Sequence, residues 1–227
     1  MRKYVFFGGY AKTDLLLFLS KMAVLSDKKV LFVDGTASEG ARYIVPAMSA
    51  GQKYITTFEG IDIAVGFFDF QDILEYTGEQ ALNYDIAILD IDSLAAYQDF
   101  EIEPQDEHCF VTGFDLYSIN RGLEVLKGFQ TPTKVTKVYF SKDMTVEEDE
   151  YIMHITQGLP ISWNEEIVYF PFEKGDQNTI NINQRFGKIK IKGLSRSYLE
   201  ALEFLAEQNL ELTNSEVKKA MKMMERA

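Results

Sequence analysis

Residues 3–13 of the chain read KYVFFGGYAKT. The first part, Lys3–Phe7, is short and mostly apolar, which is typical of a buried strand. The apolar positions that follow recur at helical spacing and predict a helix over Thr13–Leu25. Two glycines and a Lys-Thr pair therefore lie at a turn between a strand and a helix. Backbone N–H groups, a lysine and a hydroxyl at such a turn can hold phosphates and Mg²⁺.

Apolar runs typical of buried strands alternate with helical patterns almost to the end of the chain. We expect further strands at Lys29–Val33, Ile61–Phe67, Asp85–Leu89, Glu107–Thr112, Lys134–Phe140 and Glu166–Phe170. We expect further helices at Gly40–Ala50, Asp69–Tyr76, Leu116–Leu126, Thr145–Thr156, Tyr198–Gln208 and Asn214–Arg226. This alternation predicts an α/β fold with a mostly parallel sheet and helices on both faces.

Several helix starts carry side chains that can cap a helix. Asp69 is one, Thr145 with Glu148 forms a capping box, and Ser197 with Glu200 forms another. The least regular stretch is residues 175–193. Within it, three lysines alternate with two isoleucines over residues 188–192, as on a strand with one solvent-exposed face.

The composition is that of an ordinary globular protein, with 46% hydrophobic and 26% charged residues in 227. No break in composition marks a linker, so we expect a single domain over residues 1–227, with an amphipathic helix at 213–227. One cysteine excludes a disulfide scaffold and fits a reducing compartment. The sequence has neither an apolar run of about 18 residues nor the pattern of a signal peptide, so we expect a cytoplasmic protein.

The net charge of −12 is concentrated in the middle of the chain. Between Tyr54 and Asn120 there are 15 acidic residues and no Lys or Arg. Such a field repels a phosphate backbone, so we expect no nucleic-acid partner. The acidic residues serve either solubility or docking of a basic protein partner.

Two later segments extend the pattern of residues 8–13. KVLFVDG at 29–35 and YDIAILD at 84–90 are apolar strands that lead to Asp34 and Asp90. In order and spacing, the three segments resemble the MinD/ParA family of deviant Walker A ATPases, over residues 2–208. The resemblance implies a P-loop NTPase fold. It places the nucleotide phosphates on Gly8, Gly9, Tyr10, Ala11, Lys12 and Thr13. It places Mg²⁺ on Thr13, Asp34 and Asp90.

The loop departs from the family pattern Gly-Lys-Gly-Gly-x-Gly-Lys-Thr. Phe6 and Ala11 stand at two glycine positions, and Phe7 stands at the position of the signature lysine. Thr36 replaces the second acid of the family's Asp-x-Asp, and residues 140–143 offer no clear equivalent of the Asn near adenine. Loss of the lysine removes a charge that would stabilise the transition state of phosphoryl transfer. We therefore expect a degenerate Walker A loop and a pseudo-ATPase that needs no cofactor, although the loop could still hold ATP and Mg²⁺.

The resemblance implies a regulatory or positioning protein that acts through protein–protein binding, in a pilus, secretion or division assembly. We expect a protein partner or a homodimer. The alternative is an atypical ATPase that cycles between an ATP-bound dimer and an ADP-bound monomer through Lys12, Thr13 and Asp90.

Other chemical groups give weaker signals. Asp90 and Asp92 could hold a metal or transfer protons, or simply lie at the solvent-exposed end of a strand. The scattered His108, Cys109 and His154 do not predict a zinc site. Trp163 favours core packing over an exposed anchor. The C-terminal helix could pack on its own domain, bind a partner through methionines or contact a membrane weakly; its apolar face contains Val217, Ala220, Met221 and Met224.

Overall fold

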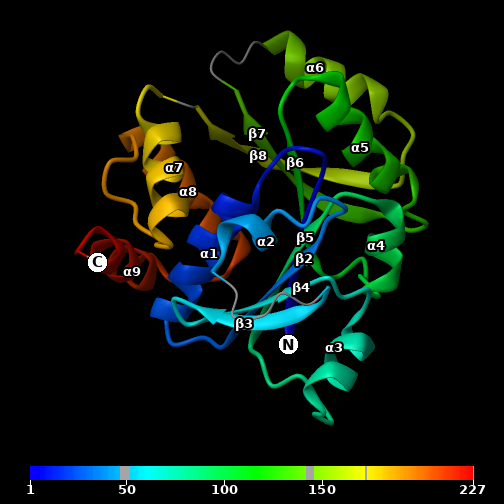
Figure 1. Cartoon of the computed structure of the whole chain (residues 1–227). Coiled ribbons are helices and arrows are strands. Elements are labelled where there is room, and N and C mark those ends of the chain that lie inside the picture. The colour runs from blue at the N-terminus through cyan, green and yellow to red at the C-terminus, as the bar shows by residue number, and fades with distance from the viewer. Residues whose placement is uncertain (47–51, 142–145, 172, 227) are drawn as a thin grey trace.

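A single mixed sheet runs through the protein (Figure 1), a computed structural model that describes residues 1–46, 52–141, 146–171 and 173–226. In these residues the sheet has eight strands in the order β3-β4-β2-β5-β1-β6-β7-β8. Every neighbouring pair is parallel except β3 and β4. The strands are β1 Arg2–Phe7, β2 Val30–Gly35, β3 Tyr54–Phe58, β4 Ile61–Val65, β5 Ile86–Ile91, β6 Glu107–Thr112, β7 Thr133–Phe140 and β8 Ile161–Phe170. The predicted α/β fold with a mostly parallel sheet is confirmed.

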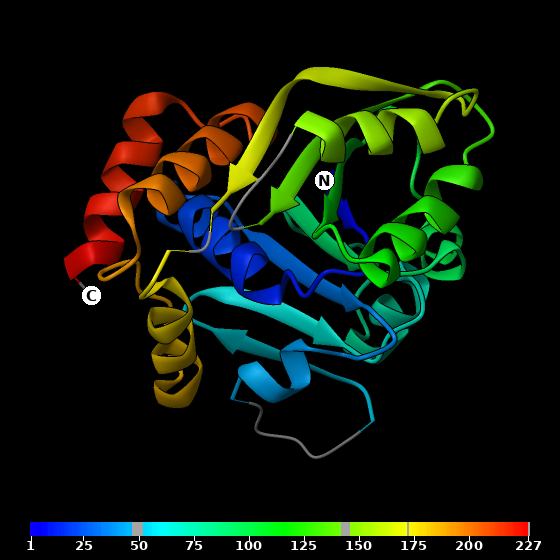
Figure 2. The ribbon, with the colours of Figure 1, turned by 90° about the horizontal axis from the view of Figure 1, so that it is seen from above.

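Helices cover both faces of the sheet, as Figure 2 shows from above. They are α1 Thr13–Leu25, α2 Ala41–Ile44, α3 Phe70–Thr77, α4 Leu94–Asp99, α5 Leu116–Lys127, α6 Val146–Ile155, α7 Asp176–Phe186, α8 Arg196–Asn209 and α9 Asn214–Arg226. Side chains of α1, α8 and α9 belong to the hydrophobic core on one face, and those of α3 to α6 belong to the core on the other. Within the described residues, no helix combines the length and the apolar character needed to cross a membrane.

Strand β1 lies at the centre of the sheet, between β5 and β6. Successive side chains of a strand point to opposite faces, so Phe6 packs in the core beneath α1 and Phe7 in the core beneath α5. Both are fully buried. Because parallel strands end at the same edge, the residues after β1, β2, β5 and β6 meet there, which is where ligands bind in open α/β sheets.

Several elements differ from the sequence expectations. Strand β3 was not predicted, because YITTF alternates weakly and pairs only with β4 at the sheet edge. Helices α4 and α7 were also missed; α7 is rich in Asn and Gln, and it is held in place by the buried side chains of Ile180 and Asn183. The strand expected at 188–192 does not form, although the burial of Ile189 and Ile191 alternates as predicted.

Of the three predicted helix caps, one is confirmed, one is wrong and one lies outside the described residues. The side chain that caps α8 is Ser195, whose Oγ accepts from Tyr198 N, whereas Ser197 Oγ donates to Glu173. The capping box of Thr145 falls on residues that are not described. The helix expected at Gly40–Ala50 is too long, because α2 ends at Ile44 and the backbone of Val45 is extended; residues 47–50 are not described. Asp69 caps α3 as expected, because its carboxylate accepts from the backbone N–H of Asp72.

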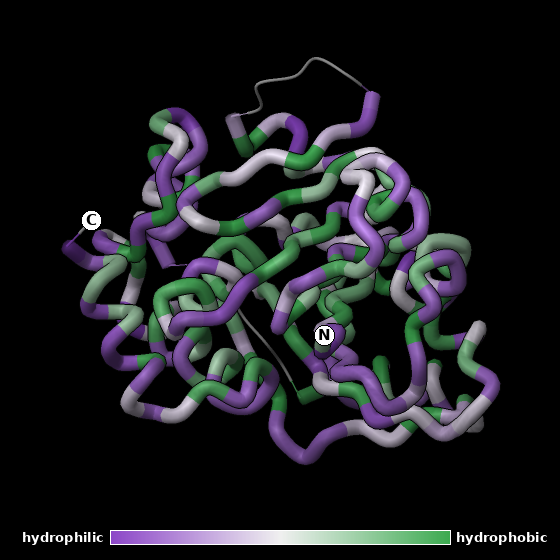
Figure 3. Tube along the Cα trace, turned by 90° about the horizontal axis from the view of Figure 1, so that it is seen from below, coloured by the Kyte–Doolittle hydropathy of each residue, from purple (hydrophilic) through white to green (hydrophobic). Residues whose placement is uncertain are grey.

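The C-terminal helix α9 packs on α1 and α8. Val217, Ala220 and Met224 are fully buried there, and Met221 is partly buried against the same core. Figure 3, coloured by hydropathy, shows how apolar and polar segments alternate along the chain. The apolar face of α9 is therefore covered by its own chain, which leaves little of it for a membrane or for a partner.

Candidate functional site

The turn between β1 and α1 depends on two glycines. Gly8 has φ +134°, and a side chain there would lie 2.1 Å from the carbonyl oxygen of Val111. A side chain on Gly9 would lie 2.9 Å from Cβ of Arg121. The Gly8 N–H donates to Ile91 O at 3.1 Å, and the Gly9 N–H donates to Ser118 O at 3.4 Å. The glycines thus let the loop run directly against β6 and α5.

This loop borders a cavity of about 570 Å³ at the carboxyl edge of the sheet. All six predicted loop residues line it: Gly8, Gly9, Tyr10, Ala11, Lys12 and Thr13. Asp90 also lines it, whereas Asp34 lines a neighbouring cavity on the other side of the loop after β2. The fold therefore brings the residues of the predicted phosphate loop and one of the two predicted aspartates to the same cavity.

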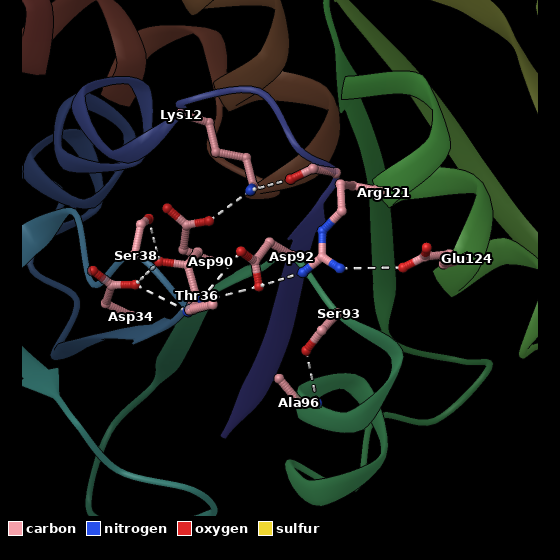
Figure 4. A network of polar contacts seen from close by, with 12 residues as sticks. Lys12, Asp34, Thr36, Ser38, Asp90, Asp92, Ser93, Ala96, Arg121 and Glu124 are labelled. Atoms are coloured by element: carbon pink, nitrogen blue, oxygen red, sulfur yellow. Dashed lines mark hydrogen bonds and ion pairs between the residues drawn. The ribbon is translucent and has the colours of Figure 1, made fainter. Parts of the chain in front are cut away.

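Lys12 forms an ion pair with Asp90 inside this site (Figure 4). Its Nζ lies 2.6 Å from Asp90 Oδ1 and donates to Gly8 O at 3.0 Å; both side chains are only 1% exposed. Thr13 Oγ1 donates to the other carboxylate oxygen of Asp90 at 3.3 Å. Burial raises the pKa of Asp90 to about 6, although the charge of Lys12 opposes the rise.

Asp34 orders the loop that follows β2. Its carboxylate accepts hydrogen bonds from the Thr36 N–H at 3.1 Å, the Thr36 hydroxyl at 2.6 Å and the Ala41 N–H at 2.7 Å. Burial raises the pKa of Asp34, which these hydrogen bonds oppose. Thr36, which stands where the resemblance has a second acid, is thus a donor to Asp34.

The metal ligands expected from the resemblance remain an expectation. Among the described residues, no group of three or more His, Cys, Asp and Glu side chains is placed to hold a metal ion. Mg²⁺ commonly takes one or two carboxylates and completes its octahedron with water and phosphate oxygens. Thr13 and Asp90 fit that arrangement beside a bound phosphate, since they contact each other at the cavity wall.

Position 7 provides no cation to the cavity. The Phe7 ring packs on the face of the sheet that α5 covers, away from α1. Its centroid lies 5.8 Å from that of the Phe110 ring, 5.9 Å from that of Phe129 and 6.5 Å from that of His108. His108 is itself buried, so it lies in the core and not in a metal site. The Cys109 thiol is also buried, and burial raises its pKa well above the ordinary value. Trp163 is half-buried and its indole packs on Phe110.

A second cavity, of about 900 Å³, shares Tyr10 with the first. The Tyr10 ring stacks on Phe140 at 4.6 Å between centroids, and Phe140 stacks on Phe170 at 4.9 Å. Glu173, Lys174 and Gln177 contribute polar groups to the same cavity. An aromatic wall with polar neighbours therefore adjoins the phosphate loop.

Sequence reasoning missed Arg121, a site residue from a distant segment, and named Asp92 only together with Asp90 as a candidate for metal binding or proton transfer. Arg121 on α5 reaches the cavity, and Asp92 after β5 connects Arg121 with the backbone of Ala37. Arg121 has no local motif. Its signal is topological, because β5 and β6 end beside β1 at the same edge.

No protein-family model matches the sequence, and no curated protein matches it either. Solved structures do resemble it over nearly their whole length. A ParA family ATPase from Chlorobium tepidum TLS has a TM-score of 0.57 and 19% identity, covering 91% of this chain and 98% of its own. A putative plasmid partition protein from Borrelia burgdorferi B31, bound to AMPPNP, has a TM-score of 0.53 and 9% identity, covering 93% and 99%.

The McdA–ATP complex from Cyanothece is similar too, with a TM-score of 0.50 and 12% identity, covering 94% of this chain and 97% of its own. At these identities the likeness is one of fold. The chain has the fold of ParA-type P-loop NTPases, as its resemblance to the MinD/ParA family predicts.

Proposed function

We propose that this chain is a positioning or regulatory protein of the MinD/ParA type that binds a nucleotide, hydrolyses it poorly and acts by binding other proteins. The fold and the position of the predicted phosphate loop support the MinD/ParA type and nucleotide binding. The departures of the loop from the family pattern support poor hydrolysis. The proposal goes beyond the sequence expectation in one respect, because it includes a retained nucleotide where no cofactor was expected to be required.

The buried Lys12–Asp90 pair is the observation that carries the proposal. Lys12 is the cation that the loop itself contributes, and it is already neutralised by Asp90 at 2.6 Å. Phe7 adds no charge, since it lies in the core on the other face. Phosphoryl transfer depends on cations placed where charge develops in the transition state, so this loop is poorly equipped for turnover.

The same site fits a bound nucleotide. The cavity borders the whole loop and the N-terminal end of α1, which no side chain caps and where the helix dipole favours phosphate. Bound Mg²⁺ would offset the phosphate charge, with Thr13 and Asp90 as its protein ligands. Lys12 must leave Asp90 to reach a phosphate. The stacked Tyr10 and Phe140 offer a flat surface for a base in the adjoining cavity.

The partner that we propose is a protein or a second copy of this chain, in a pilus, secretion or division assembly in the cytoplasm. The acidic middle of the sequence supports a basic protein surface as the complement. It argues against nucleic acid, and we expect no gel shift of duplex DNA at physiological salt with or without ATP. The five basic residues between Arg185 and Arg196, a stretch without acids, are where DNA binding would arise if this expectation is wrong.

Calorimetric titration with ATP and Mg²⁺ tests the nucleotide half of the proposal. We expect saturable binding that weakens when Mg²⁺ is removed and when Thr13 is replaced by alanine. Heat that cannot be distinguished from dilution would contradict nucleotide binding and leave only the protein-binding role.

The alternative function is the ATP-driven dimer cycle, and the convergence of Lys12, Thr13 and Asp90 in one cavity favours it. Size-exclusion chromatography with light scattering separates the two. The alternative requires a dimer with ATP and a monomer with ADP, whereas our proposal predicts the same oligomeric state with both nucleotides.

A further inference from the structure

Arg121 is placed against the phosphate loop by the packing of α5. Its Cβ and Cγ lie 2.9 and 3.0 Å from the point where a Gly9 side chain would begin, so its stem runs directly over the loop backbone. The side chain is 27% exposed and lines the same cavity as Lys12. Figure 4 shows the guanidinium and the Lys12 ammonium in the same network.

The hydrogen bonds of the guanidinium are incomplete. Nη1 donates to Glu124 at 3.2 Å, but Glu124 is 59% exposed. Nη2 lies 3.7 Å from Asp92 Oδ1, which is too long for a hydrogen bond. Nε is buried and has no hydrogen-bond partner among the described residues. A buried donor without an acceptor is costly, so movement of the guanidinium toward acceptors on a ligand in the cavity would be favoured.

The charges around the cavity form two matched pairs. Lys12 is held by Asp90, and Arg121 lies beside Asp92, whose oxygens also accept from the Ala37 N–H at 3.2 Å. A free anion would meet both carboxylates and be repelled. An anion that arrives with a divalent cation avoids this, because the metal neutralises carboxylate charge and frees the two side chains for the anion.

We propose that Arg121 is a phosphate-binding residue, and that with Lys12 it grips the polyphosphate of a nucleotide that enters with Mg²⁺. This rests on the proposed function, because it concerns the same cavity. The planar guanidinium carries a fork of donors that fits phosphate oxygens bidentately, as a lysine cannot. The charge comes from α5 of the same chain.

The test compares Arg121→Gln with Arg196→Gln, a matched change at a side chain that is 91% exposed on α8. Calorimetry measures binding of ATP, ADP and inorganic tripolyphosphate, each with Mg²⁺. Loss of a charged hydrogen bond should weaken binding of ATP and tripolyphosphate about tenfold or more for Arg121→Gln. Arg196→Gln should bind like the wild type. Arg121→Lys should recover only part of the affinity.

Asp92→Asn gives an independent readout that a structural role of Arg121 would not move. In EDTA it should bind tripolyphosphate more tightly than the wild type, because a repelling carboxylate is gone and Arg121 is released. Adding Arg121→Gln should abolish that gain.

Each outcome decides a different point. If the wild type binds ATP and Arg121→Gln binds it equally while remaining folded by circular dichroism, Arg121 is not a phosphate ligand and the proposed function stands. If the wild type binds neither ATP nor tripolyphosphate, this inference and the nucleotide half of the proposed function both fail. Binding of tripolyphosphate as tightly as ATP would identify free polyphosphate as the source of the ligand and remove the nucleotide from the proposal.

Discussion

The Lys12–Asp90 pair has opposing effects on stability and on binding. Two charges 2.6 Å apart and almost fully buried lose their hydration, and their mutual attraction and the hydrogen bonds to Gly8 O and Thr13 offset that loss. Removing one partner leaves the other as a buried group without compensation. The pair therefore stabilises the observed loop conformation, and a ligand must replace its contacts to bind.

We expect Lys12→Met to lower the free energy of unfolding by about 3 kcal/mol, because it strands the buried Asp90 carboxylate. Lys12→Met combined with Asp90→Asn should recover much of the loss, since the charge is then gone from both sides. Urea denaturation of the three proteins measures this. A single variant within about 0.5 kcal/mol of wild type would mean that water already satisfies Asp90.

His108 should make stability depend on pH. Its Nδ1–H donates to Asp106 O at 2.7 Å, so Nε2 accepts from the Tyr97 hydroxyl at 2.9 Å in the neutral ring. Burial lowers the pKa of His108, so below about pH 6.5 the unfolded chain binds a proton that the folded chain resists. We therefore expect neutral His108 to contribute to the free energy of unfolding above that pH, and this contribution to be lost as the pH falls. Comparing urea midpoints of the wild type and His108→Phe from pH 7.5 to 5 isolates the effect; parallel curves would exclude it.

Elements whose local sequence pattern matches their burial in the fold were predictable. The helix expected at Thr13–Leu25 begins and ends at those residues, and β1 differs from its prediction by one residue. Helix α7 and strand β3 were not, because a polar helix and an edge strand depend on contacts made elsewhere in the chain. The cap of α8 was placed two residues late for a similar reason: only the fold shows that Ser195 also donates to Asp176 at 2.9 Å.

That difference can be tested within α8. We expect Ser195→Ala to lower the free energy of unfolding by about 1–2 kcal/mol, because the N-terminal hydrogen bond to the Tyr198 N–H is lost. Ser197→Ala, the matched control, should cost about 0.5 kcal/mol or less, since its hydroxyl donates to Glu173 at the surface. Thermal and urea unfolding would measure both. A larger loss of stability for Ser197→Ala than for Ser195→Ala would support the capping box predicted from Ser197 and Glu200.

At the scale of the whole molecule, the sequence identified the site residues that lie in short local motifs. The glycine loop and Asp90 were predictable because each is a short motif next to a strand. Arg121 and its contact with Asp92 were not, because they depend on the strand order β2-β5-β1-β6, which no local pattern encodes. Asp34 and Thr36 were identified, but their hydrogen bonds to each other became visible only in the fold.

The acidic middle of the chain leads to a prediction about association. Asp99, Glu101 and Glu103 are exposed at the end of α4, whereas Asp106 is partly buried and its carboxylate accepts from the Glu103 N–H. We expect replacement of the first three by lysine to reduce the association rate with a protein partner or second copy, without unfolding. Light scattering and binding kinetics at low and high salt would show it. Association that is insensitive to both salt and the triple change would rule out charge-guided docking.

The most direct test of the central claim is the release of phosphate from ATP under single-turnover conditions, with Mg²⁺ and with protein in excess. The wild type is compared with Lys12→Ala, and circular dichroism confirms that both are folded. We predict that the wild type binds ATP but hydrolyses it no faster than Lys12→Ala, because Lys12 is neutralised by Asp90 and Phe7 adds no charge. A clear rate that falls on removal of Lys12 would contradict a non-hydrolysing site and establish the ATP-driven cycle in its place.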